Sequence, residues 1–425
     1  MGLVVRLSVL AGLAALVFPG QASAGVQTLV FDSAPITVTR YEVARGVQLA
    51  PSPKVDGYVV GMSAEVVDVL GNPVPMQDLM LHHVVFAKVG VPDYTCSTID
   101  DYSGKPAPFQ AQRFYAEGEE HFSLALPDGY GYPNRGRDAW GLLYMLMNHH
   151  PDTMTVQIRY TVRYVTGEFL TAVKPVWLDI ENCRADPVFS VPGTGEAGST
   201  LSRTADFVMP ESGRFVAGGA HLHGGGLSLD VSDSNCGSFF TSYPTWGQIF
   251  PRPVLHEPGP MQMTGFADAL GRPVRAGDTV RLAASYDNSR PHVRVMGIVI
   301  LYFAPGPTSG CVFYASPVPP ASEAERVTIE QLKPPAGPLR RDIRSTWVGD
   351  YSFGAQRVSL PRGATFTWRF RGSVEHDVTL ASGPVGFASP SMRHGSYTFR
   401  FTRPGTYHLF CSLHPARMTQ TVIVR

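Results

Sequence analysis

Four residues near the C-terminus have the side chains that hold copper in electron-transfer proteins. Cys411, His414 and Met418 lie together in the stretch Cys-Ser-Leu-His-Pro-Ala-Arg-Met, and His376 lies upstream in Val-Glu-His-Asp-Val. One thiolate, two imidazoles and a thioether are the ligands of a blue (type 1) copper centre, in which copper lies in a His₂Cys plane with Met weakly axial. This set accepts Cu(I) and Cu(II) with little reorganisation, so the pattern predicts an electron-transfer site.

The segments around these residues alternate like half-buried strands. Residues 365–371, 396–401 and 421–424 place apolar side chains at every second position and are separated by Gly and Pro turns. This pattern predicts a small β-sandwich. Residues 345–425 therefore resemble the cupredoxin family, in which the Cys and the second His lie on the loop before the last strand, and the resemblance implies a Greek-key β-sandwich. The chain departs from that family in the spacing between His414 and Met418, which is three residues where plastocyanin-like members commonly have four or two.

A second set of metal-binding residue types lies upstream, in three histidine clusters: His82 with His83, His149 with His150, and His221 with His223. His221 and His223 are two residues apart, so on a strand both rings project from one face and can chelate one ion. Met296 begins the last strand of the same region. A His₂Met set suits copper, because the thioether favours Cu(I) and leaves positions open for O₂.

The adjacent pair His82 and His83 needs a special backbone to bind one metal. Neighbouring residues on a regular strand point to opposite faces, so the two rings can share an ion only where the strand ends or bulges. Surface or hydrogen-bonded core histidines are the ordinary alternative for every cluster. Three such clusters on a chain that also carries an electron-transfer domain favour metal binding.

Several motifs follow one another in a recognisable order over approximately residues 27–304. These are Leu-His-His-Val-Val-Phe, Leu-Pro-Asp-Gly-Tyr, a strand ending in His, His-x-His, and a Met on a late strand. The order resembles the ascorbate-dependent type II copper monooxygenases, the family of peptidylglycine hydroxylating monooxygenase and dopamine β-monooxygenase. The resemblance implies two jelly-roll-like β-sandwich domains, each with one mononuclear, type 2-like copper. The first copper would relay electrons, and the second would bind O₂ and hydroxylate a C–H bond.

The same resemblance implies roles for the clustered residues. His82 and His83 would belong to the relay copper, whereas the catalytic copper would be held by His221, His223 and Met296. The third relay ligand of the family usually lies in a short His-Tyr or His-Asn motif.

This chain instead has Met-Asn-His-His at the position of the third relay ligand. We assign His149 to that role. Met147 shares the strand face of His149, and the strand register could also present His150, so both residues remain open as alternatives.

Length and composition set the class of protein. The chain of 425 residues is too long for one ordinary domain, and its 35 basic and 35 acidic residues show no excess that would indicate nucleic-acid binding. Arg6, the apolar run 7–18 and Ala-Ser-Ala at 22–24 have the layout of a cleavable signal peptide. We therefore expect residues 1–24 to be removed from a secreted or periplasmic protein that is soluble after cleavage.

Composition also indicates where the domains lie. We expect an all-β chain with sandwich domains at 25–190 and 191–304, a Pro-rich linker at 305–344 and the cupredoxin domain at 345–425. With Cys411 assigned to copper, four cysteines can pair in an oxidising compartment in three ways. We favour Cys96 with Cys183 and Cys236 with Cys311, because each pair stays within one expected domain.

These observations predict a copper-dependent monooxygenase-like enzyme with three coppers. The type 1 centre would pass electrons from ascorbate or a redox protein to the other two, and O₂ would oxidise a small organic substrate of unknown identity. A copper protein that transfers electrons or holds copper without hydroxylating anything shares every ligand and is the first alternative. A structural β-sandwich protein with incidental histidines is the second.

Overall fold

The computed structural model describes residues 25–96, 110–247, 259–308 and 334–425, together with 257, 310–312, 314 and 319. The expected signal peptide at 1–24 and most of the expected linker lie outside these residues. Within them the chain consists of strands, turns and loops and has no helix, which confirms the all-β prediction. No described segment forms an apolar helix of membrane-spanning length.

The first sandwich is made of two sheets that face each other. Its strands are β1 (Gly25–Asp32), β2 (Ile36–Val38), β3 (Val43–Ala50), β4 (Gly57–Asp68), β5 (Leu79–Val89), β6 (Ala111–Gly118), β7 (Leu124–Ala125), β8 (Tyr130–Asn134), β9 (Trp140–Asn148), β10 (Met154–Thr166) and β11 (Thr171–Ala172). One sheet has the order β1-β10-β4-β8-β11, and the other has the order β3-β9-β5-β6. Buried and less buried residues alternate along β10, as expected for a strand with one face on the core.

The second sandwich is also built from two main sheets. Its strands are β12 (Lys174–Asp179), β13 (Phe189–Val191), β14 (Thr200–Val208), β15 (Gly213–Leu222), β16 (Gly226–Asp233), β17 (Gly237–Ser242), β18 (Pro244–Thr245), β19 (Gln262–Met263), β20 (Phe266–Val274), β21 (Thr279–Asp287), β22 (His292–Val295) and β23 (Gly297–Pro305). The main sheets have the orders β12-β23-β15-β20 and β14-β21-β16-β17, and β13 pairs with β22.

The second sandwich begins earlier than the sequence indicated. β12 pairs antiparallel with β23, and β13 pairs with β22, so both strands before residue 191 belong to this sandwich. The Gly- and Pro-containing stretch after β13, which we expected to separate two domains, is a connection inside the second sandwich. Such a stretch breaks strands in either setting, so composition alone could not distinguish the two.

The third sandwich contains the remaining strands. They are β24 (Arg340–Arg341), β25 (Ser345–Gly349), β26 (Ser352–Phe353), β27 (Arg357–Leu360), β28 (Thr365–His376), β29 (Thr379–Ser382), β30 (Met392–Arg400), β31 (Gly405–Phe410) and β32 (Thr419–Val424). Its sheets have the orders β24-β27-β32-β31-β29 and β26-β25-β28-β30. β24 lies within the segment that we expected to be linker, so this domain starts a few residues before 345.

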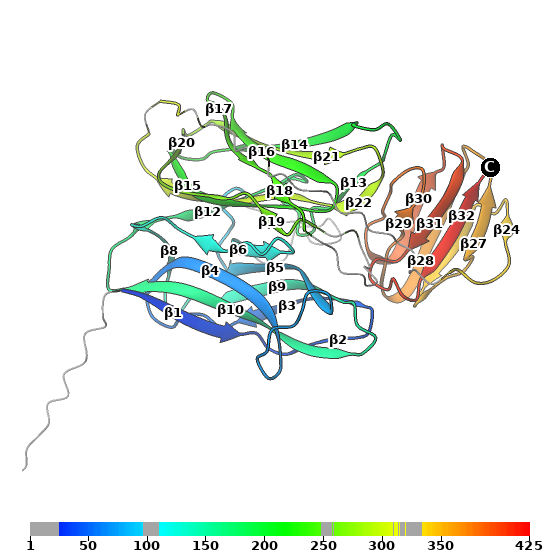
Figure 1. Cartoon of the computed structure of the whole chain (residues 1–425), viewed down its shortest axis with the longest axis horizontal. Helices are drawn as coiled ribbons and strands as arrows, with labels where there is room; N and C mark the ends of the chain where they lie inside the picture. The colour runs from blue at the N-terminus through cyan, green and yellow to red at the C-terminus, as the bar shows by residue number, and fades with distance from the viewer. Residues whose placement is uncertain are drawn as a thin grey trace, which may run out of the picture.

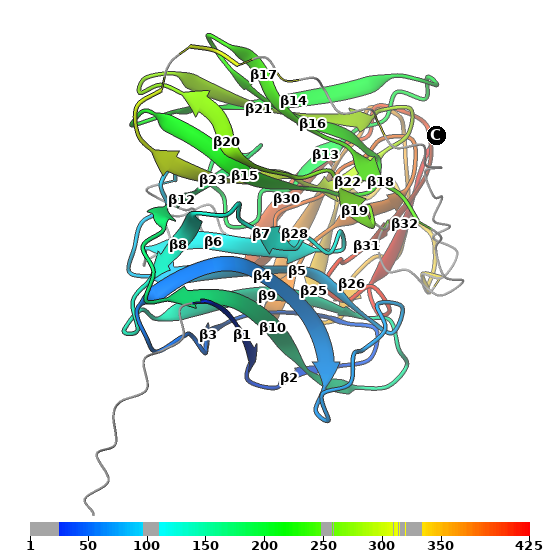
Figure 2. The ribbon, with the colours of Figure 1, turned by 60° about the vertical axis from the view of Figure 1, so that its left-hand side comes forward.

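The first two sandwiches are stacked on each other, and the third lies at one end of the stack (Figures 1 and 2). One continuous cluster of buried apolar side chains runs through both stacked sandwiches, from residue 36 to residue 304. The third sandwich has its own core, to which Val293 of the second sandwich adds a contact. The Tyr302 hydroxyl in β23 also donates a hydrogen bond to the Phe114 carbonyl oxygen in β6 at 2.9 Å. The stacked sandwiches thus form one packed unit.

Two disulfides join segments distant in sequence, Cys96 with Cys183 and Cys236 with Cys311. This confirms the favoured pairing. The reason was wrong for both pairs, however. Cys183 follows β12, so the first bond joins the first sandwich to the second, and Cys311 lies beyond the expected domain end at residue 304. Cys411 is the free cysteine among the described residues.

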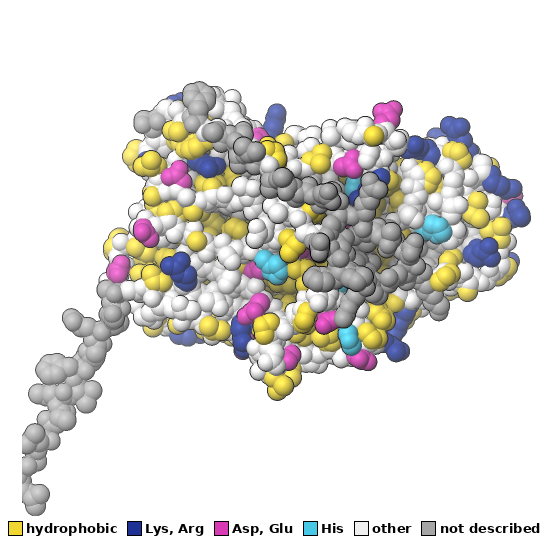
Figure 3. All heavy atoms as spheres, in the orientation of Figure 1, with side chains coloured by type: hydrophobic (Ala, Val, Ile, Leu, Met, Phe, Trp, Pro, Cys, Tyr) yellow, Lys and Arg dark blue, Asp and Glu magenta, His cyan; other side chains and the backbone are white. Residues whose placement is uncertain are grey.

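Positive charge is concentrated in the third sandwich. Twelve of the 35 basic residues but only four of the 35 acidic residues lie in residues 334–425, which leaves an acidic excess of eight in the rest of the chain. Figure 3 shows Lys and Arg side chains gathered over that end of the molecule. The third sandwich and the stacked pair are therefore complementary in charge.

The shared core leads to an expectation about unfolding. Leu282 in β21 is fully buried in that core, so Leu282→Ala should lower the free energy of unfolding by about 3 kcal/mol. Because one core serves both stacked sandwiches, they should unfold in a single calorimetric transition of the copper-free protein, and that transition alone should shift. Val422→Ala, in the core of the third sandwich, should move only a second transition. Separate transitions for the two stacked sandwiches would contradict the shared core.

Candidate metal centres

The C-terminal candidate site lies at one end of the third sandwich. His376 ends β28, Cys411 follows β31, and His414 lies on the loop before β32. The Cys411 Sγ atom is 3.9 Å from His376 Nδ1 and 3.6 Å from His414 Nδ1. A thiolate at about 2.3 Å and an imidazole nitrogen at about 2.0 Å from one ion, separated by a trigonal angle, are about 3.7 Å apart. The three donors therefore fit one metal in a trigonal plane.

Burial shifts the pKa values of Cys411 and His414 in directions that bear on metal binding. Cys411 and His376 are fully buried. Burial, and then the neighbouring Asp377 carboxylate, raises the pKa of the Cys411 thiol, so a metal rather than solvent must displace its proton. Burial, and then His376, lowers the pKa of His414 to about 4, which keeps this imidazole neutral and able to bind metal at neutral pH.

Backbone hydrogen bonds hold the ligand loop in place. The Met418 N–H donates to the His414 carbonyl oxygen at 3.0 Å, and the Cys411 N–H donates to the Met418 carbonyl oxygen at 3.1 Å. The Asp377 N–H points at the Cys411 sulfur, 3.5 Å away, and such outer contacts tune a metal centre. Met418 is fully buried and packs in the same core as Cys411.

A β-bulge lies at the adjacent histidines of the first sandwich. The pairing of β5 with β9 shifts register between Leu81 and His83, so His82 is the extra residue of the bulge. As a result both rings lie on the same side, with their Nδ1 atoms 3.0 Å apart. This is the backbone irregularity that a shared metal requires of an adjacent pair.

The His-x-His pair of the second sandwich meets in a similar way. His221 is near the end of β15 and His223 follows the strand, and their Nε2 atoms are 3.0 Å apart. Two imidazole nitrogens at about 2.0 Å from one ion, at an angle near 90°, are separated by about 2.9 Å. The geometry thus permits chelation of one ion by this pair.

The two histidine pairs lie together rather than in separate domains. The rings of His82 and His223 are in edge-to-face contact, with centroids 5.0 Å apart, so the four imidazoles form one cluster between the stacked sandwiches. We name His82, His83, His221 and His223 the histidine cluster. The sequence indicated one candidate site in each sandwich and gave no distance between them, and the packing of the shared core places the two pairs next to each other.

The strand pairing does not identify the third relay ligand, and His149 stays a prediction for that role. In the described part of the chain, His376, Cys411 and His414 form a trio whose ligand atoms lie within 4.8 Å of one another. β9 places Met145 opposite His83, and the buried His149 follows Asn148, the last residue of β9, which is opposite Leu79 at the start of β5.

Met147 and His150 stay open as alternatives for the third ligand. Met147 is buried opposite Met80, and His150 forms an ion pair with Asp152 at 3.4 Å. The strand register therefore does not single out a third ligand for the adjacent histidines.

Sequence reasoning missed a carboxylate that orients one of the histidines. The Nδ1 atom of His221 lies 2.8 Å from Glu120 Oε2, so Nδ1–H donates to the carboxylate and Nε2 is left to face a metal. Burial alone would lower the pKa of His221, but Glu120 and then Glu119 raise it. The run Glu-Gly-Glu-Glu-His at 117–121 was the available signal, since acidic residues beside a buried strand are uncommon.

A pocket opens beside the histidine cluster. His83, His221 and Met296 contribute to its wall, so residues expected at two different coppers line one space. The rest of the lining is mainly apolar and includes Val85, Ala116, Phe122, Leu143, Trp177, Ile298 and Ile300. The pocket can thus hold an apolar molecule next to the candidate metal ligands.

Comparisons with known proteins point to copper as well. The chain is 26% identical over 270 residues to the probable copper-dependent oxygenase clz3 of Cochliobolus lunatus, covering 56% of this chain and 79% of that protein. It is also 26% identical over 251 residues to the probable copper-dependent oxygenase M1 of a Phoma species, covering 54% of this chain and 58% of that protein. Both relatives are copper-dependent oxygenases by name. No family model matches the chain.

Solved structures similar to part of the chain include a cupredoxin and an amicyanin. One is a purple cupredoxin from Nitrosopumilus maritimus, 25% identical, which covers 20% of this chain and all of that chain with a TM-score of 0.18. The other is an oxidised amicyanin mutant, 25% identical, which covers 19% of this chain and 80% of that chain with a TM-score of 0.18. At these TM-scores the likeness supports no conclusion about the whole molecule.

The Glu120 contact should matter for metal affinity. Glu120→Gln removes the charged acceptor that orients His221, so the affinity of the histidine cluster for copper should fall about 10- to 100-fold. Competition titration with a copper chelator would measure this loss. Glu117→Gln, which changes a carboxylate in the same pocket that does not contact a histidine of the cluster, should have a smaller effect. Equal losses in the two variants would contradict the orienting role.

The partly buried His83 should make the copper-free protein sensitive to acid. Burial lowers the pKa of His83 to about 4, from 6.5 in an exposed histidine. The unfolded chain therefore takes up this proton at higher pH than the folded chain, and stability falls by about 3 kcal/mol between pH 7 and pH 4 through this residue. Urea unfolding at both pH values should show that His83→Gln loses about 3 kcal/mol less stability than wild type between pH 7 and pH 4. Equal losses in the two proteins would contradict this role of His83.

Proposed function

We propose that the chain is an exported, copper-dependent monooxygenase-like enzyme with its own electron-transfer domain. In this proposal Cys411, His376, His414 and Met418 hold a type 1 copper, and the histidine cluster with Met296 holds the copper that uses O₂. Copper at the first site would exchange single electrons, and copper at the second would activate O₂ for insertion of one oxygen atom into a C–H bond.

The observation that carries this proposal is the meeting of His83, His221 and Met296 in the wall of one pocket. Nitrogen and thioether donors beside a space for an organic molecule are what oxidation of a bound substrate requires. The similarity to two copper-dependent oxygenases supports the same class of reaction. Because these relatives match just over half of the chain, the activity of the whole protein is part of the proposal.

The chain's own residues would prepare the site for this chemistry. Glu120 holds His221 in the tautomer whose Nε2 faces the metal. The Tyr286 hydroxyl donates a hydrogen bond to the carbonyl oxygen of Met296 and fixes the backbone beside the thioether. The His223 N–H donates to the same hydroxyl at 3.1 Å, so one buried tyrosine positions two proposed ligands.

The lining of the pocket indicates the substrate class. Its side chains are chiefly aliphatic and aromatic, and its two carboxylates, Glu117 and Glu120, are already engaged by hydrogen bonds within the protein. A pocket of this kind gains affinity by burying apolar surface. We therefore propose a small apolar organic substrate, with an external one-electron reductant such as ascorbate or a redox protein.

Export would place the protein in a secreted or periplasmic setting. The two disulfides support this part of the proposal, since such bonds persist in oxidising compartments. The N-terminal residues that carry the expected signal lie outside the described chain.

A copper-holding or electron-transfer protein without hydroxylase activity is the second candidate. It is favoured by one observation, that the trio of donor side chains gathered in the described part of the chain, His376, Cys411 and His414, is a ligand set for electron transfer.

Met296→Ala distinguishes the two candidates. If the thioether supports the copper that uses O₂, this variant should lower steady O₂ consumption at least tenfold with ascorbate and a set of apolar substrates. The blue absorbance should stay unchanged, because the type 1 ligands are in another domain, whereas Cys411→Ser should abolish it. Met209→Ala is the matched control, since Met209 is a buried methionine of the second sandwich that does not line the pocket. Absence of O₂ consumption in the wild type would favour the second candidate.

A further inference from the structure

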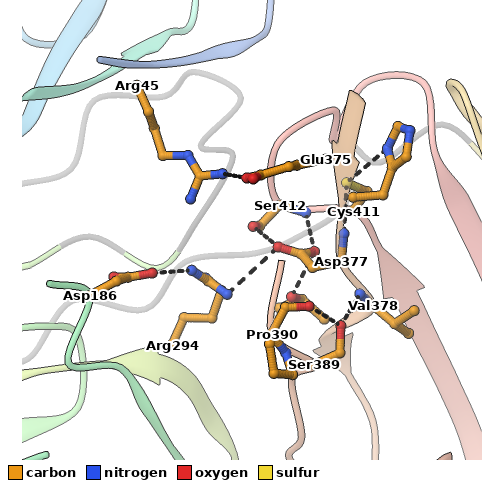
Figure 4. Close-up of polar contacts among 12 residues, drawn as sticks. Arg45, Asp186, Arg294, Glu375, Asp377, Val378, Ser389, Pro390, Cys411 and Ser412 are labelled. Atoms are coloured by element: carbon orange, nitrogen blue, oxygen red, sulfur yellow. Dashed lines mark hydrogen bonds and ion pairs between the residues drawn. The ribbon is translucent and has the colours of Figure 1, made fainter. Parts of the chain in front are cut away.

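Two carboxylates flank His376, and each contacts an arginine from a different sandwich. Arg45 of the first sandwich contacts Glu375, with Nη2 and Oε2 2.8 Å apart. Arg294 of the second sandwich contacts Asp377, with Nη1 and Oδ2 3.6 Å apart. Figure 4 shows both arginines reaching toward the same short segment of the third sandwich. We call these two ion pairs the arginine clasp.

Arg294 occupies an unusual backbone position. It lies where the pairing of β22 with β13 shifts register, between Val293 and Val295, and its φ of 55° is in the left-handed region. A non-glycine residue is strained there, and such strain persists only where the surroundings enforce it. The bulge directs the guanidinium toward Asp377, and a second ion pair with Asp186 at 3.0 Å steadies it.

Asp377 connects the clasp to the thiolate ligand. Its carboxylate accepts hydrogen bonds from the N–H of Ser412, at 2.7 Å, and from the Ser412 hydroxyl. Its own N–H points at the Cys411 sulfur. Asp377 is fully buried, so its charge is not screened by water and Arg294 is close compensation for it. A short bonded path thus leads from Cys411 to Arg294.

The other ends of the two arginines lead to the pocket. Met296 follows Arg294 by two residues, and its side chain lines the pocket. Arg45 on β3 is opposite Met145 on β9, and Met145 is in turn opposite His83 on β5. Each half of the clasp therefore connects the segment around His376 with a residue of the pocket wall.

We propose that the arginine clasp fixes the third sandwich as an internal electron donor, with Arg294 as the positioning residue of the main route. The route runs from Cys411 through Asp377 and Arg294 to Met296. One electron at a time passes from reduced type 1 copper to oxidised copper at the pocket, and no bond is made or broken. An external one-electron reductant restores the first centre. This inference rests on the proposed function.

Charge complementarity supports this docking. The third sandwich has an excess of eight basic residues, and the rest of the chain has an equal acidic excess. Opposite net charges favour association of two surfaces and fix their orientation. The clasp reverses the charges locally, because the third sandwich supplies the carboxylates and the stacked sandwiches supply the arginines. Net charge alone allows several orientations of the third sandwich on the stacked pair. Ion pairs with this reversed arrangement of charge would select one of them.

Arg294→Gln tests the route in the full-length, copper-loaded protein. Loss of the cation near Cys411 should disfavour the reduced state, so the reduction potential of the blue centre should shift downward. After flash reduction of that centre, the rate at which its blue absorbance returns should fall at least tenfold. Arg45→Gln should slow the return less, and the double variant should slow it most.

Arg403→Gln is the matched control, because Arg403 also joins the third sandwich to the second but through the carbonyl oxygens of Gly193 and Thr194. It should leave the potential and the transfer rate within twofold of wild type. If Arg294→Gln and Arg403→Gln had equal effects, the clasp would only hold the domains together, and the proposal would be overturned. Arg294→Lys keeps the charge and should retain the potential, which provides a second measurement if the Gln variant folds poorly.

The potential is measured without O₂ or substrate, so it separates two kinds of failure. A lowered potential in Arg294→Gln together with no O₂ consumption in the wild type would preserve the clasp and remove the oxygenase proposal. An unchanged potential and an unchanged transfer rate in Arg294→Gln would overturn the clasp, whether or not the protein consumes O₂.

Discussion

The continuous apolar core shared by the stacked sandwiches is the constraint on which the rest of the structure depends. It presses one face of the first sandwich against the second and so brings His82 against His223. The same packing places Glu120, from the connection after β6, beside His221. Neither sandwich alone has this site, because each supplies only part of the histidine cluster and the pocket wall.

Packing the sandwiches against one another also buries polar groups. Ionised side chains in an apolar interior must be paired, and this chain pairs them across domain boundaries. Glu120 meets His221 across the stacked sandwiches, and Arg294 meets Asp377 across the second boundary. The electrostatic contacts therefore specify how the three sandwiches are oriented, whereas the apolar cores provide most of their stability.

The sequence predicted those parts of the site that are local in the chain. Cys411 and His414 are three residues apart, and strand alternation around them was enough to expect the arrangement in which they meet His376. His221 and His223 met for the same reason, because two-residue spacing puts both rings on one face of a strand. The all-β class also followed from composition, whereas the favoured disulfide pairing was right although the domain bounds on which it rested were not.

The parts that the sequence did not predict depend on tertiary register. The bulge that brings the rings of His82 and His83 to one side is set by the pairing of β5 with β9. Glu120 becomes a partner of His221 only when the sandwiches stack. Arg294 has no distinguishing sequence context, since a single arginine between two valines also fits an exposed strand position. Such contacts join residues about a hundred positions apart, which no local pattern records.

The position of β12 has a consequence for how this architecture could be divided. β12 covers the outer edge of β23, whose sequence Gly-Ile-Val-Ile-Leu-Tyr-Phe is almost entirely apolar. A chain cut at residue 191 would leave that strand as an exposed, unpaired edge, which is a template for aggregation. The second sandwich is therefore not a portable module. A gene fusion or domain exchange made before the third sandwich can preserve solubility, because it leaves β12 paired with β23. One made between the first two sandwiches cannot.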